Sequence, residues 1–302
     1  MNQVIRVKDL SKHFGDLKAV SNLSFTVGEG QVYGFLGQNG AGKSTTIRML
    51  MTLIEPTEGE IEIFGMNLRK HRKEILRQTG AIIEKPDLYK YLTARENLRI
   101  FSRLSGVKST DKQIMDQLAL VGLAERAGSK VKTYSQGMKQ RLGLACALIH
   151  NPGLIILDEP SNGLDPQGIA DMRQLLIHLS RDLGKTLVVS SHLLSEMEMV
   201  ADNMLIIHKG EKVVEGKVSE LLDPEKTVVE LMTPDIAAAM SILKESTWQH
   251  ALKEPVKGTI RLECNRNEIP TLNKMLVEKG IPVLSLRPLN SLEDYFLSLT
   301  KV

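Results

Sequence analysis

Cysteines and long apolar runs are scarce in this chain of 302 residues. Its two cysteines, Cys146 and Cys264, lie far apart and fit neither a disulfide framework nor a metal-binding spacing, so a reducing cytosol is the expected compartment. The apolar stretches at residues 142–149 and 154–157 are far shorter than the roughly 20 residues that a membrane-spanning helix requires. The first residues lack the apolar run of a signal peptide. If the protein serves a membrane, we therefore expect another polypeptide to cross it.

A large net charge is absent as well. The 39 lysines and arginines nearly balance the 36 aspartates and glutamates, leaving a net charge of +3 at pH 7, which is too small to indicate a nucleic-acid partner. We expect the densest basic cluster, residues 69–73, to be the solvated surface of a turn or helix. The composition, 42% hydrophobic and 25% charged, is ordinary for a soluble globular protein, and the length is sufficient for two domains.

Short apolar segments with the character of strands recur along the first two thirds of the chain. These segments are residues 4–7, 23–27, 32–36, 154–157, 186–189, 204–207 and 212–215. Residues 86–150 lack runs of β-branched residues and contain two candidate helices, 94–104 and 112–121. Strands that alternate with helices predict an α/β fold with a mainly parallel sheet covered on both faces. The helical block at about residues 86–150 is predicted to be an inserted subdomain.

The composition shifts near residues 221–224, which predicts two domains, residues 1–222 and 223–302. The second domain reads in order as a strand, a helix with an apolar stripe, a weak strand, a strand, a helix and a strand. The corresponding segments are residues 228–232, 236–243, 248–252, 260–264, 269–278 and 283–287. This β-α-β-β-α-β order predicts a small ferredoxin-like α+β domain, followed by a last helix at residues 292–299.

The segment Gly-Gln-Asn-Gly-Ala-Gly-Lys-Ser at residues 37–44 matches the phosphate-binding pattern G-x-x-x-x-G-K-[ST] between a predicted strand and a predicted helix. Glycines let backbone N–H groups curl around phosphates, and the helix N-terminus favours negative charge. Lys43 should reach the β- and γ-phosphates, and the Ser44 hydroxyl should bind Mg²⁺. The expected nucleotide-binding residues are Gly37, Asn39, Gly40, Ala41, Gly42, Lys43, Ser44 and Thr45. The alternative is a structural glycine-rich turn.

Two carboxylates, Asp158 and Glu159, follow the buried strand at residues 154–157. Ligands of open α/β sheets bind at the carboxyl ends of such strands. We expect Asp158 to hold Mg²⁺ through water and Glu159 to orient and deprotonate an attacking water, a role worth ~10²–10⁴-fold in rate. Adjacent strand residues point to opposite faces, so separate roles are physically reasonable. The alternative is an acidic strand end before a helix.

Four further positions are ambiguous when they are considered singly. Ser135 opens a predicted helix, where serine ordinarily satisfies free backbone N–H groups. Gly137 costs that helix roughly 1 kcal/mol relative to alanine, and a close approach of the backbone to a phosphate would explain it. His192 follows the buried strand at residues 186–191, and without the other motifs it would be interpreted as a structural residue. Phe14, taken by itself, would be interpreted as a core residue.

Together these motifs, over roughly residues 3–220, resemble the nucleotide-binding subunit of ABC transporters. The resemblance implies that residues 37–44 are the Walker A loop and residues 154–159 the Walker B strand. Residues 134–138, Tyr-Ser-Gln-Gly-Met, are similar to the LSGGQ signature and retain its serine and second glycine. Ser135 and Gly137 of one copy would then close over the γ-phosphate held by another. The remaining implied assignments are Asp165 in the D-loop, His192 as the switch histidine, and Phe14 stacked on adenine.

The family's Q-loop glutamine is replaced here by Glu84, within Ile-Glu-Lys-Pro at residues 83–86. By resemblance Glu84 belongs with the catalytic and Mg²⁺-binding residues, although glutamate brings a charge where glutamine offers a neutral carbonyl. The same segment resembles the subset that exports bacitracin, lantibiotics and similar peptides. The alternative is an ordinary surface glutamate before a proline-containing loop.

We therefore expect an ATPase subunit that uses ATP and Mg²⁺ and drives a separate multi-span permease. It would work as a dimer of two such chains on the inner face of the cell membrane. Residues 223–302 would then be an accessory domain for dimerisation or regulation, with a structural lid as the alternative. A soluble ABC-type ATPase acting on nucleic acid or ribosomes is the rival function. Its DNA-repair members insert long coiled coils, whereas fewer than 120 residues without sustained heptads separate Lys43 from Asp158. A P-loop kinase would leave residues 135–137 unexplained.

Overall fold

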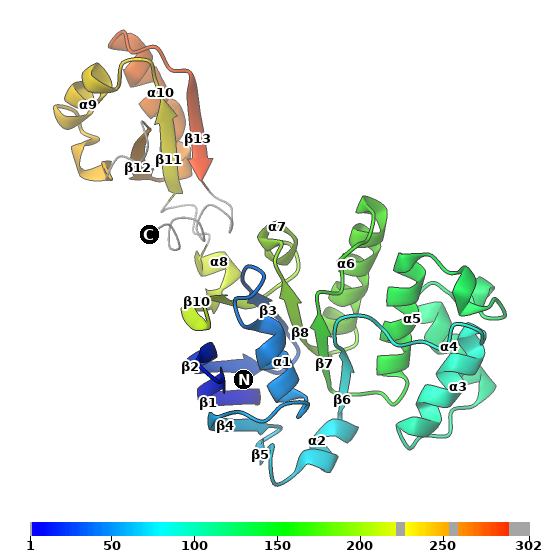
Figure 1. Cartoon of the computed structure of the whole chain (residues 1–302). Coiled ribbons are helices and arrows are strands. Elements are labelled where there is room, and N and C mark those ends of the chain that lie inside the picture. Colours follow the sequence, from blue (N-terminus) through cyan, green and yellow to red (C-terminus); the bar gives the residue numbers. More distant parts are fainter. Residues whose placement is uncertain (1, 222–226, 254–258, 290–302) are drawn as a thin grey trace. The chain divides into compact units, whose positions relative to one another are not determined.

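The computed structural model describes residues 2–221, 227–253 and 259–289. The chain separates into two compact units, Met1–Gly216 and Lys217–Val302 (Figure 1). Among the described residues, none of the helices combines the length and the apolar character that a membrane crossing demands.

A six-stranded sheet forms the centre of the first unit, in the order β10-β9-β3-β8-β7-β6 (Figure 1). Its strands are β3 Val32–Leu36, β6 Thr79–Ile82, β7 Leu154–Asp158, β8 Thr186–Ser191, β9 Asn203–His208 and β10 Glu211–Lys217. The five strands from β9 to β6 run parallel to their neighbours, and every residue of β3, β7 and β8 is buried. The predicted mainly parallel sheet is confirmed. Its carboxyl edge brings together the residues that follow β3, β7 and β8.

A second sheet, which the sequence analysis did not predict, is antiparallel and has the order β2-β1-β4-β5. Its strands are β1 Gln3–Phe14, β2 Leu17–Gly28, β4 Glu58–Ile63 and β5 Met66–Asn67. The sequence analysis predicted strands at residues 4–7 and 23–27 but did not say which sheet they join. Only two residues join β1 to β2, with Phe14 opposite Leu17, and so short a connection can join antiparallel strands but not parallel ones.

The helix α1, Lys43–Leu50, contacts strands of both sheets. Its apolar residues Ile47 and Leu50 belong to one buried cluster with Ile5 of β1 and Ile156 of β7. Burial of apolar surface, which contributes roughly 25 cal/mol per Å², stabilises this arrangement. The core therefore fixes the start of α1, and with it the glycine loop, against the end of β7.

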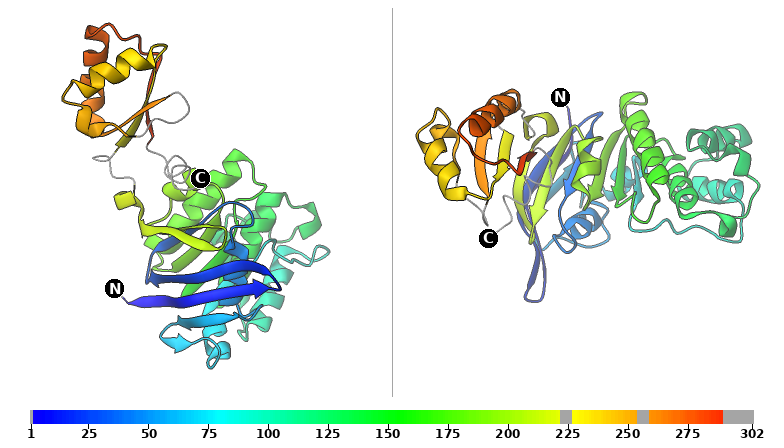
Figure 2. Two further views of the ribbon diagram at one scale, coloured as in Figure 1. Left: turned by 60° about the vertical axis from the view of Figure 1, so that its left-hand side comes forward. Right: turned by 90° about the horizontal axis from the view of Figure 1, so that it is seen from above.

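The predicted helical subdomain is confirmed. Its helices are α3 Ala94–Leu104, α4 Asp111–Leu120 and α5 Gln136–Leu148, with short 3₁₀ turns η1 Ala124–Arg126 and η2 Val131–Thr133. α3 and α4 begin at capping boxes formed by Thr93 with Glu96 and by Thr110 with Gln113, a signal that is visible in the sequence. α5 contacts β6 as well as α3 and α4, so the block lies beside the β6 edge of the sheet (Figure 2). The other helices of this unit are α2 Arg72–Arg77, α6 Pro166–Arg181 and α7 Leu194–Glu198.

The second unit has one strand fewer than predicted among its described residues. Its elements are α8 Val218–Leu221, β11 Thr227–Met232, α9 Ile236–Lys244, η4 Gln249–Ala251, β12 Ile260–Cys264, η5 Arg266–Glu268, α10 Ile269–Glu278 and β13 Ser285–Leu289. The three strands form an antiparallel sheet in the order β12-β11-β13. The predicted helix at residues 292–299 lies outside the described residues.

The weak strand predicted at residues 248–252 is wrong. Trp248 and Ala251 are buried in the core of the second unit, and the intervening residues form the 3₁₀ turn η4. Burial at a spacing of three suits a helical turn, whereas a strand buries every second residue. Only an isolated bridge between Leu252 and Leu262 remains where the fourth strand of a ferredoxin-like sheet was expected.

Candidate functional site

The glycine loop connects β3 to α1 and lies in close contact with neighbouring backbone. A Cβ atom on Gly37 would lie 2.4 Å from the carbonyl oxygen of Ile207. On Gly42, whose φ is +107°, it would lie 2.6 Å from the carbonyl oxygen of Ala19. No side chain fits at these distances, so glycine is required at both positions.

Lys43, the first residue of α1, is almost fully buried. Its ammonium group donates to the carbonyl oxygen of Gly37 at 2.7 Å and to that of Gln38 at 3.3 Å. It also lies 3.2 Å from Oε1 of Glu159. A buried ammonium group requires such partners to offset its lost hydration. The predicted lysine and the predicted general base are therefore in direct contact.

The carboxyl ends of β7 and β8 share a hydrogen-bond network centred on Ser190. This fully buried hydroxyl donates to Oδ1 of Asp158 at 2.6 Å and accepts a hydrogen bond from the backbone N–H of Glu159 at 2.9 Å. Asp158 is itself only 1% exposed. The sequence analysis did not identify Ser190. Its one available signal was a polar residue at the end of a buried apolar strand.

Glu159 lies between two groups that carry or can carry positive charge. Its Oε2 atom lies 2.7 Å from Nδ1 of His192, and its Oε1 atom faces Lys43. Its backbone is left-handed, with φ of +52°, a conformation that costs of order 1–3 kcal/mol away from glycine and is found at functional sites. The structure thus brings Lys43, Asp158, Glu159 and His192 together, as the motif order indicated.

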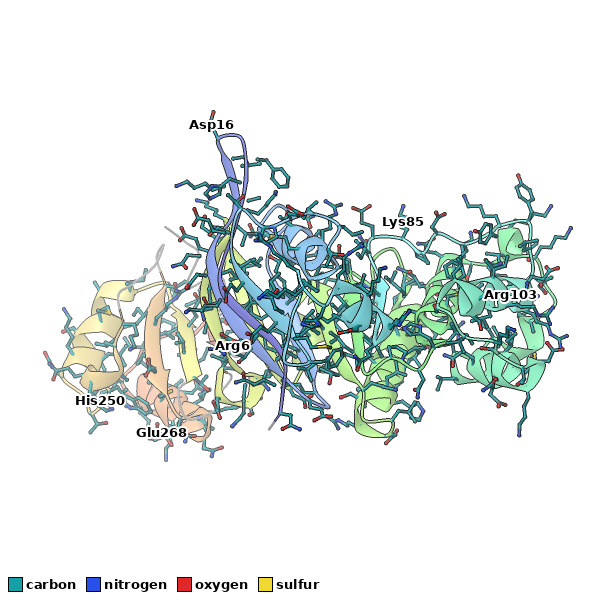
Figure 3. All side chains as sticks on the ribbon, turned by 90° about the horizontal axis from the view of Figure 1, so that it is seen from below. Arg6, Asp16, Lys85, Arg103, His250 and Glu268 are labelled. Carbon is teal, nitrogen blue, oxygen red and sulfur yellow. The ribbon has the colours of Figure 1, made fainter. Side chains whose placement is uncertain are left out.

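A cavity of about 510 Å³ opens beside this network. The residues that line it are Phe14, Leu17, Lys18, Ala19, Gln38, Asn39, Gly40, Gly42, Lys43, Ser44, Thr45, Glu159 and Lys209. Phe14 is 49% exposed, so the alternative that it belongs to the core is wrong. The ammonium group of Lys12 lies over the Phe14 ring, 5.0 Å from its centroid. Phe14 is carried on the β1–β2 hairpin, which projects from its unit with Asp16 at the tip (Figure 3).

Several predicted residues do not line this cavity. Gly37 and Ala41 of the glycine loop, Asp158 at the end of β7 and His192 after β8 lie next to its lining residues, whereas Ser135, Gly137 and Asp165 belong to other parts of the chain. Ser135 is the N-cap of α5 and accepts a hydrogen bond from the N–H of Met138 at 3.2 Å. Asp165 is the N-cap of α6 and accepts from the N–H of Gly168 at 3.1 Å. The nearest atom to a Cβ on Gly137 would be a Leu164 methyl carbon at 3.7 Å, so no contact among the described residues requires glycine there.

Glu84 also lies outside the cavity lining. It follows β6 in a left-handed conformation, with φ of +64° and a side chain 62% exposed. Its carboxylate pairs with the guanidinium group of Arg48 on α1. The sequence analysis did not foresee this partner, because Arg48 is 36 residues away along the chain.

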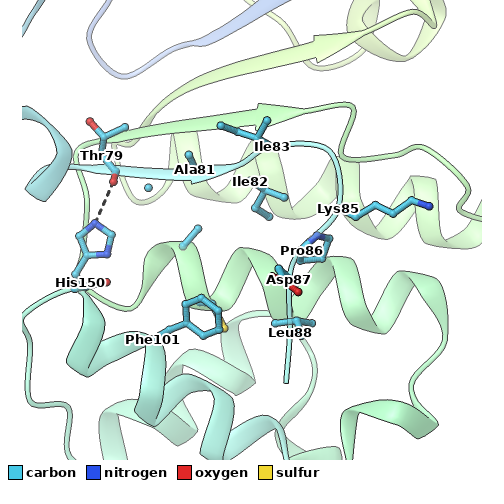
Figure 4. A pocket seen from close by; sticks show the side chains of 15 residues that line it. Thr79, Ala81, Ile82, Ile83, Lys85, Pro86, Asp87, Leu88, Phe101 and His150 are labelled. Atoms are coloured by element: carbon cyan, nitrogen blue, oxygen red, sulfur yellow. Dashed lines mark hydrogen bonds between the residues drawn. The ribbon is translucent and has the colours of Figure 1, made fainter. Parts of the chain in front are cut away.

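A second hollow, of about 270 Å³, lies between β6, the segment that follows it and helices α3 and α5 (Figure 4). Ile82, Pro86 and Phe101 surround it, whereas Lys85 is directed away (Figure 4). Burial lowers the pKa of His150, whose Nε2 atom lies 3.3 Å from the carbonyl oxygen of Thr79. Cys146 lines the same wall, and burial raises the pKa of its thiol, as expected of an unreactive core cysteine.

The segment that bounds this hollow is tightly packed against α5. A Cβ on Gly143 of α5 would lie 2.4 Å from Cβ of Pro86. Two residues before Pro86 is Glu84, and α5 begins directly after Ser135. The segment around Pro86 and α5 are therefore in close contact, with no room for a side chain at position 143.

Comparisons with known proteins agree with these features. The protein family described as ABC transporter matches residues 20–162. The chain is 44% identical to the bacitracin transport ATP-binding protein BcrA of Bacillus licheniformis, over 99% of this chain and 98% of that protein. It is 40% identical to the lantibiotic transport ATP-binding protein SrtF of Streptococcus pyogenes, over 70% of this chain and 90% of that protein.

Solved structures give the same result for the first unit. An ATP-binding subunit of an ABC transporter is 32% identical with a TM-score of 0.64, over 72% of this chain and 91% of that chain. A dimeric ATP-binding cassette, MJ0796, solved with ADP and phosphate in a post-hydrolysis state, is 27% identical with a TM-score of 0.64, over 71% of this chain and 98% of that chain.

Proposed function

Because this chain belongs to the ATP-binding proteins of the ABC transporter family and is an ATPase, we propose that it powers a separate membrane permease that exports peptide or drug-like molecules. The placement of the Glu159 carboxylate between Lys43 and His192 at the cavity wall carries the catalytic part of this proposal. The export part rests on the similarity to bacitracin and lantibiotic transport proteins. The protein would then act at the inner face of the cell membrane.

The cavity residues divide into binding and catalytic roles. Phe14 stacks on the adenine with the ring face that Lys12 leaves open, a contact worth ~1–3 kcal/mol. The loop N–H groups and Lys43 bind the phosphates, and phosphate oxygens replace the carbonyl oxygens that Lys43 contacts in the free protein. Glu159 accepts a proton from the attacking water. His192 holds the Glu159 carboxylate in position through its Nδ1 atom.

The residues present fit a Mg²⁺ site. Mg²⁺ prefers oxygen ligands, and the Ser44 hydroxyl and the buried Asp158 carboxylate supply them beside the phosphate-binding loop. Ser190 occupies one Asp158 oxygen, which leaves the other available. Bound Mg²⁺ neutralises charge on the β- and γ-phosphates. Glu84 pairs with Arg48 through Oε1, so a contact of Glu84 with this set would use its other carboxylate oxygen.

The position of Ser135, Gly137 and Asp165 outside the cavity supports a dimer. Within one chain Ser135 and Asp165 cap helices, and Gly137 is a half-buried residue of α5 at which a side chain would fit. We propose that a second copy of this chain presents Ser135 and Gly137 to the γ-phosphate, which makes two shared ATP sites per dimer. The second unit, residues 217–302, would stabilise or regulate this dimer.

Ser135→Arg tests the dimer. The added side chain should block closure on the phosphate of the other copy and reduce ATP hydrolysis at least tenfold, whereas ATP binding to the isolated chain should be unchanged because Ser135 lies outside the cavity. Sedimentation with ATP and titration calorimetry measure the two effects. Thr26→Arg adds the same charge at an exposed position of β2, outside the cavity lining, and is the control. An ATP-dependent dimer of Ser135→Arg would refute the shared site.

The second hollow, between β6, α3 and α5, is the surface that we assign to the permease. Its apolar residues Ile82, Leu88 and Phe101 can bind an apolar cytoplasmic segment. Residues 87–92 lie beside it, and the Pro86–Gly143 contact joins this surface to α5. ATP-driven closure would therefore move the permease through the helical subdomain.

Purification of the chain from its native membrane in mild detergent tests the whole proposal. We expect a multi-span membrane protein to co-purify, and mass spectrometry would identify it. Phe101→Asp should abolish the association while retaining ATP binding, because Phe101 lines the second hollow and contacts Tyr89, and neither residue lines the first cavity. Recovery with ribosomes or nucleic acid, and without a membrane protein, would overturn the transport function and leave the ATPase chemistry in place.

A further inference from the structure

Three backbone segments that are distant in sequence meet beside the cavity described above. The N–H of Gly210, in the turn between β9 and β10, donates to the carbonyl oxygen of Ala41 at 3.0 Å, and the N–H of Ser21 donates to the carbonyl oxygen of Gly210 at 2.9 Å. A Cβ on Gly42 or on Gly210 would lie 2.6 or 2.9 Å from the carbonyl oxygen of Ala19. The glycine loop, strand β2 and the β9–β10 turn are therefore in close backbone contact with one another.

A lysine adjoins each of these contact points. Lys18 precedes Ala19, Lys43 follows Gly42, and Lys209 precedes Gly210. All three line the cavity, whose one acidic lining residue is Glu159. Three ammonium groups against one carboxylate give the cavity a surplus of positive charge.

Lys18 and Lys209 differ from Lys43 in two ways. Their side chains are exposed, and they make no ion pair or side-chain hydrogen bond with the described residues. Lys43 is buried and holds three oxygen partners. Lys209 has φ of +49° and Gly210 has φ of +83°, a two-residue hairpin turn in which asparagine is the favoured first residue. The turn geometry alone therefore gives no reason for a lysine.

We propose that Lys18 and Lys209 are phosphate-binding residues that contact the polyphosphate of ATP from the mouth of the cavity, while Lys43 acts from its floor. The inference rests on the assignment of this cavity as the ATP site. Each exposed ammonium contributes through a screened Coulomb attraction. The contacts between β2, the loop and the β9–β10 turn keep both lysines close to the phosphates, because none of these segments can move independently.

The double variant Lys18→Ala/Lys209→Ala tests this role. Exposed charge pairs are each worth up to ~1 kcal/mol, so titration calorimetry should show the Kd for ATP raised about fivefold to twentyfold at low salt. The dependence of this Kd on salt concentration should also become shallower. Adenosine, which has no phosphate, should bind as it does to the wild type. In hydrolysis assays KM should rise while kcat is retained, because Lys43 and Glu159 are untouched.

Two comparisons make the result decisive. Lys8→Ala/Lys108→Ala removes the same charge from exposed positions outside the cavity and should bind ATP as the wild type does. Lys18→Arg/Lys209→Arg keeps both charges and should retain most of the affinity. Wild-type ATP affinity in the alanine variant, or an equal loss in the control, would overturn the inference. An equal loss for adenosine would show that the hairpin and not the charge is responsible. Failure of the wild type to bind ATP would instead overturn the assignment of the cavity.

Discussion

Replacement of Glu159 by glutamine should lower the rate of ATP hydrolysis about 10²–10⁴-fold, the range expected when a general base is removed. Glutamine has the same shape, and its amide can still contact Lys43 and His192, which lie 3.2 and 2.7 Å from the carboxylate oxygens. It cannot accept the proton of the attacking water. Binding of ATP should persist, because the loop N–H groups and Lys43 are retained.

The Glu159→Gln variant should accumulate as a nucleotide-bound dimer, because hydrolysis is the step that reopens the pair. Release of phosphate measures the rate, and sedimentation with ATP measures the dimer. Glu211→Gln makes the same chemical change at an exposed position of β10 and should hydrolyse ATP at the wild-type rate. Wild-type turnover by Glu159→Gln would exclude Glu159 as the base, whatever the state of the dimer.

Local signals predicted most elements of the fold. The lack of β-branched runs predicted α3 and α4, although the capping boxes at Thr93 and Thr110, which mark their starts, were not used. The apolar strands that alternate with helices predicted a sheet buried on both faces. The antiparallel sheet was missed because alternating burial describes a half-buried strand without saying which strand it pairs with. The distinguishing sign was the two-residue connection after Phe14. The error at Trp248 arose because five residues are too few to establish a period; the apolar Trp248, Ala251 and Leu252 have the spacing of a helical turn.

The position of the candidate catalytic residues was predictable for a topological reason. Residues that follow neighbouring parallel strands meet at one edge, so Asp158, Glu159 and His192 had to lie near Lys43. Side chains brought in by other contacts were not predictable. Lys209 lines the cavity because the neighbouring Gly210 packs near the glycine loop. A contact between segments so far apart in the sequence cannot be predicted from a local sequence pattern. The pairing of Glu84 with Arg48 was unpredictable for the same reason, because the two residues are distant in the sequence.

Ser190→Ala should destabilise the protein by about 2–4 kcal/mol, although Ser190 belongs to no recognised motif. The hydroxyl is fully buried and satisfies both Oδ1 of Asp158 and the N–H of Glu159. Alanine would leave a buried carboxylate oxygen and a backbone donor without their partner, and each unsatisfied group costs ~1–3 kcal/mol. Hydrolysis should also fall, because this hydrogen bond helps to hold Glu159 in its left-handed backbone conformation.

Denaturant unfolding monitored by circular dichroism measures the first effect, and phosphate release at saturating ATP measures the second. Ser191→Ala is the matched control, because that hydroxyl contacts only the backbone of Leu193, at 3.0 and 3.4 Å, and its loss should cost less than ~1 kcal/mol. Equal unfolding midpoints for the two variants would show that the hydrogen bonds of Ser190 contribute no more to stability than those of Ser191. A destabilised Ser190→Ala protein that hydrolyses ATP at the wild-type rate would show that the Glu159 backbone is held by the β7–α6 connection itself, independently of the neighbouring strand.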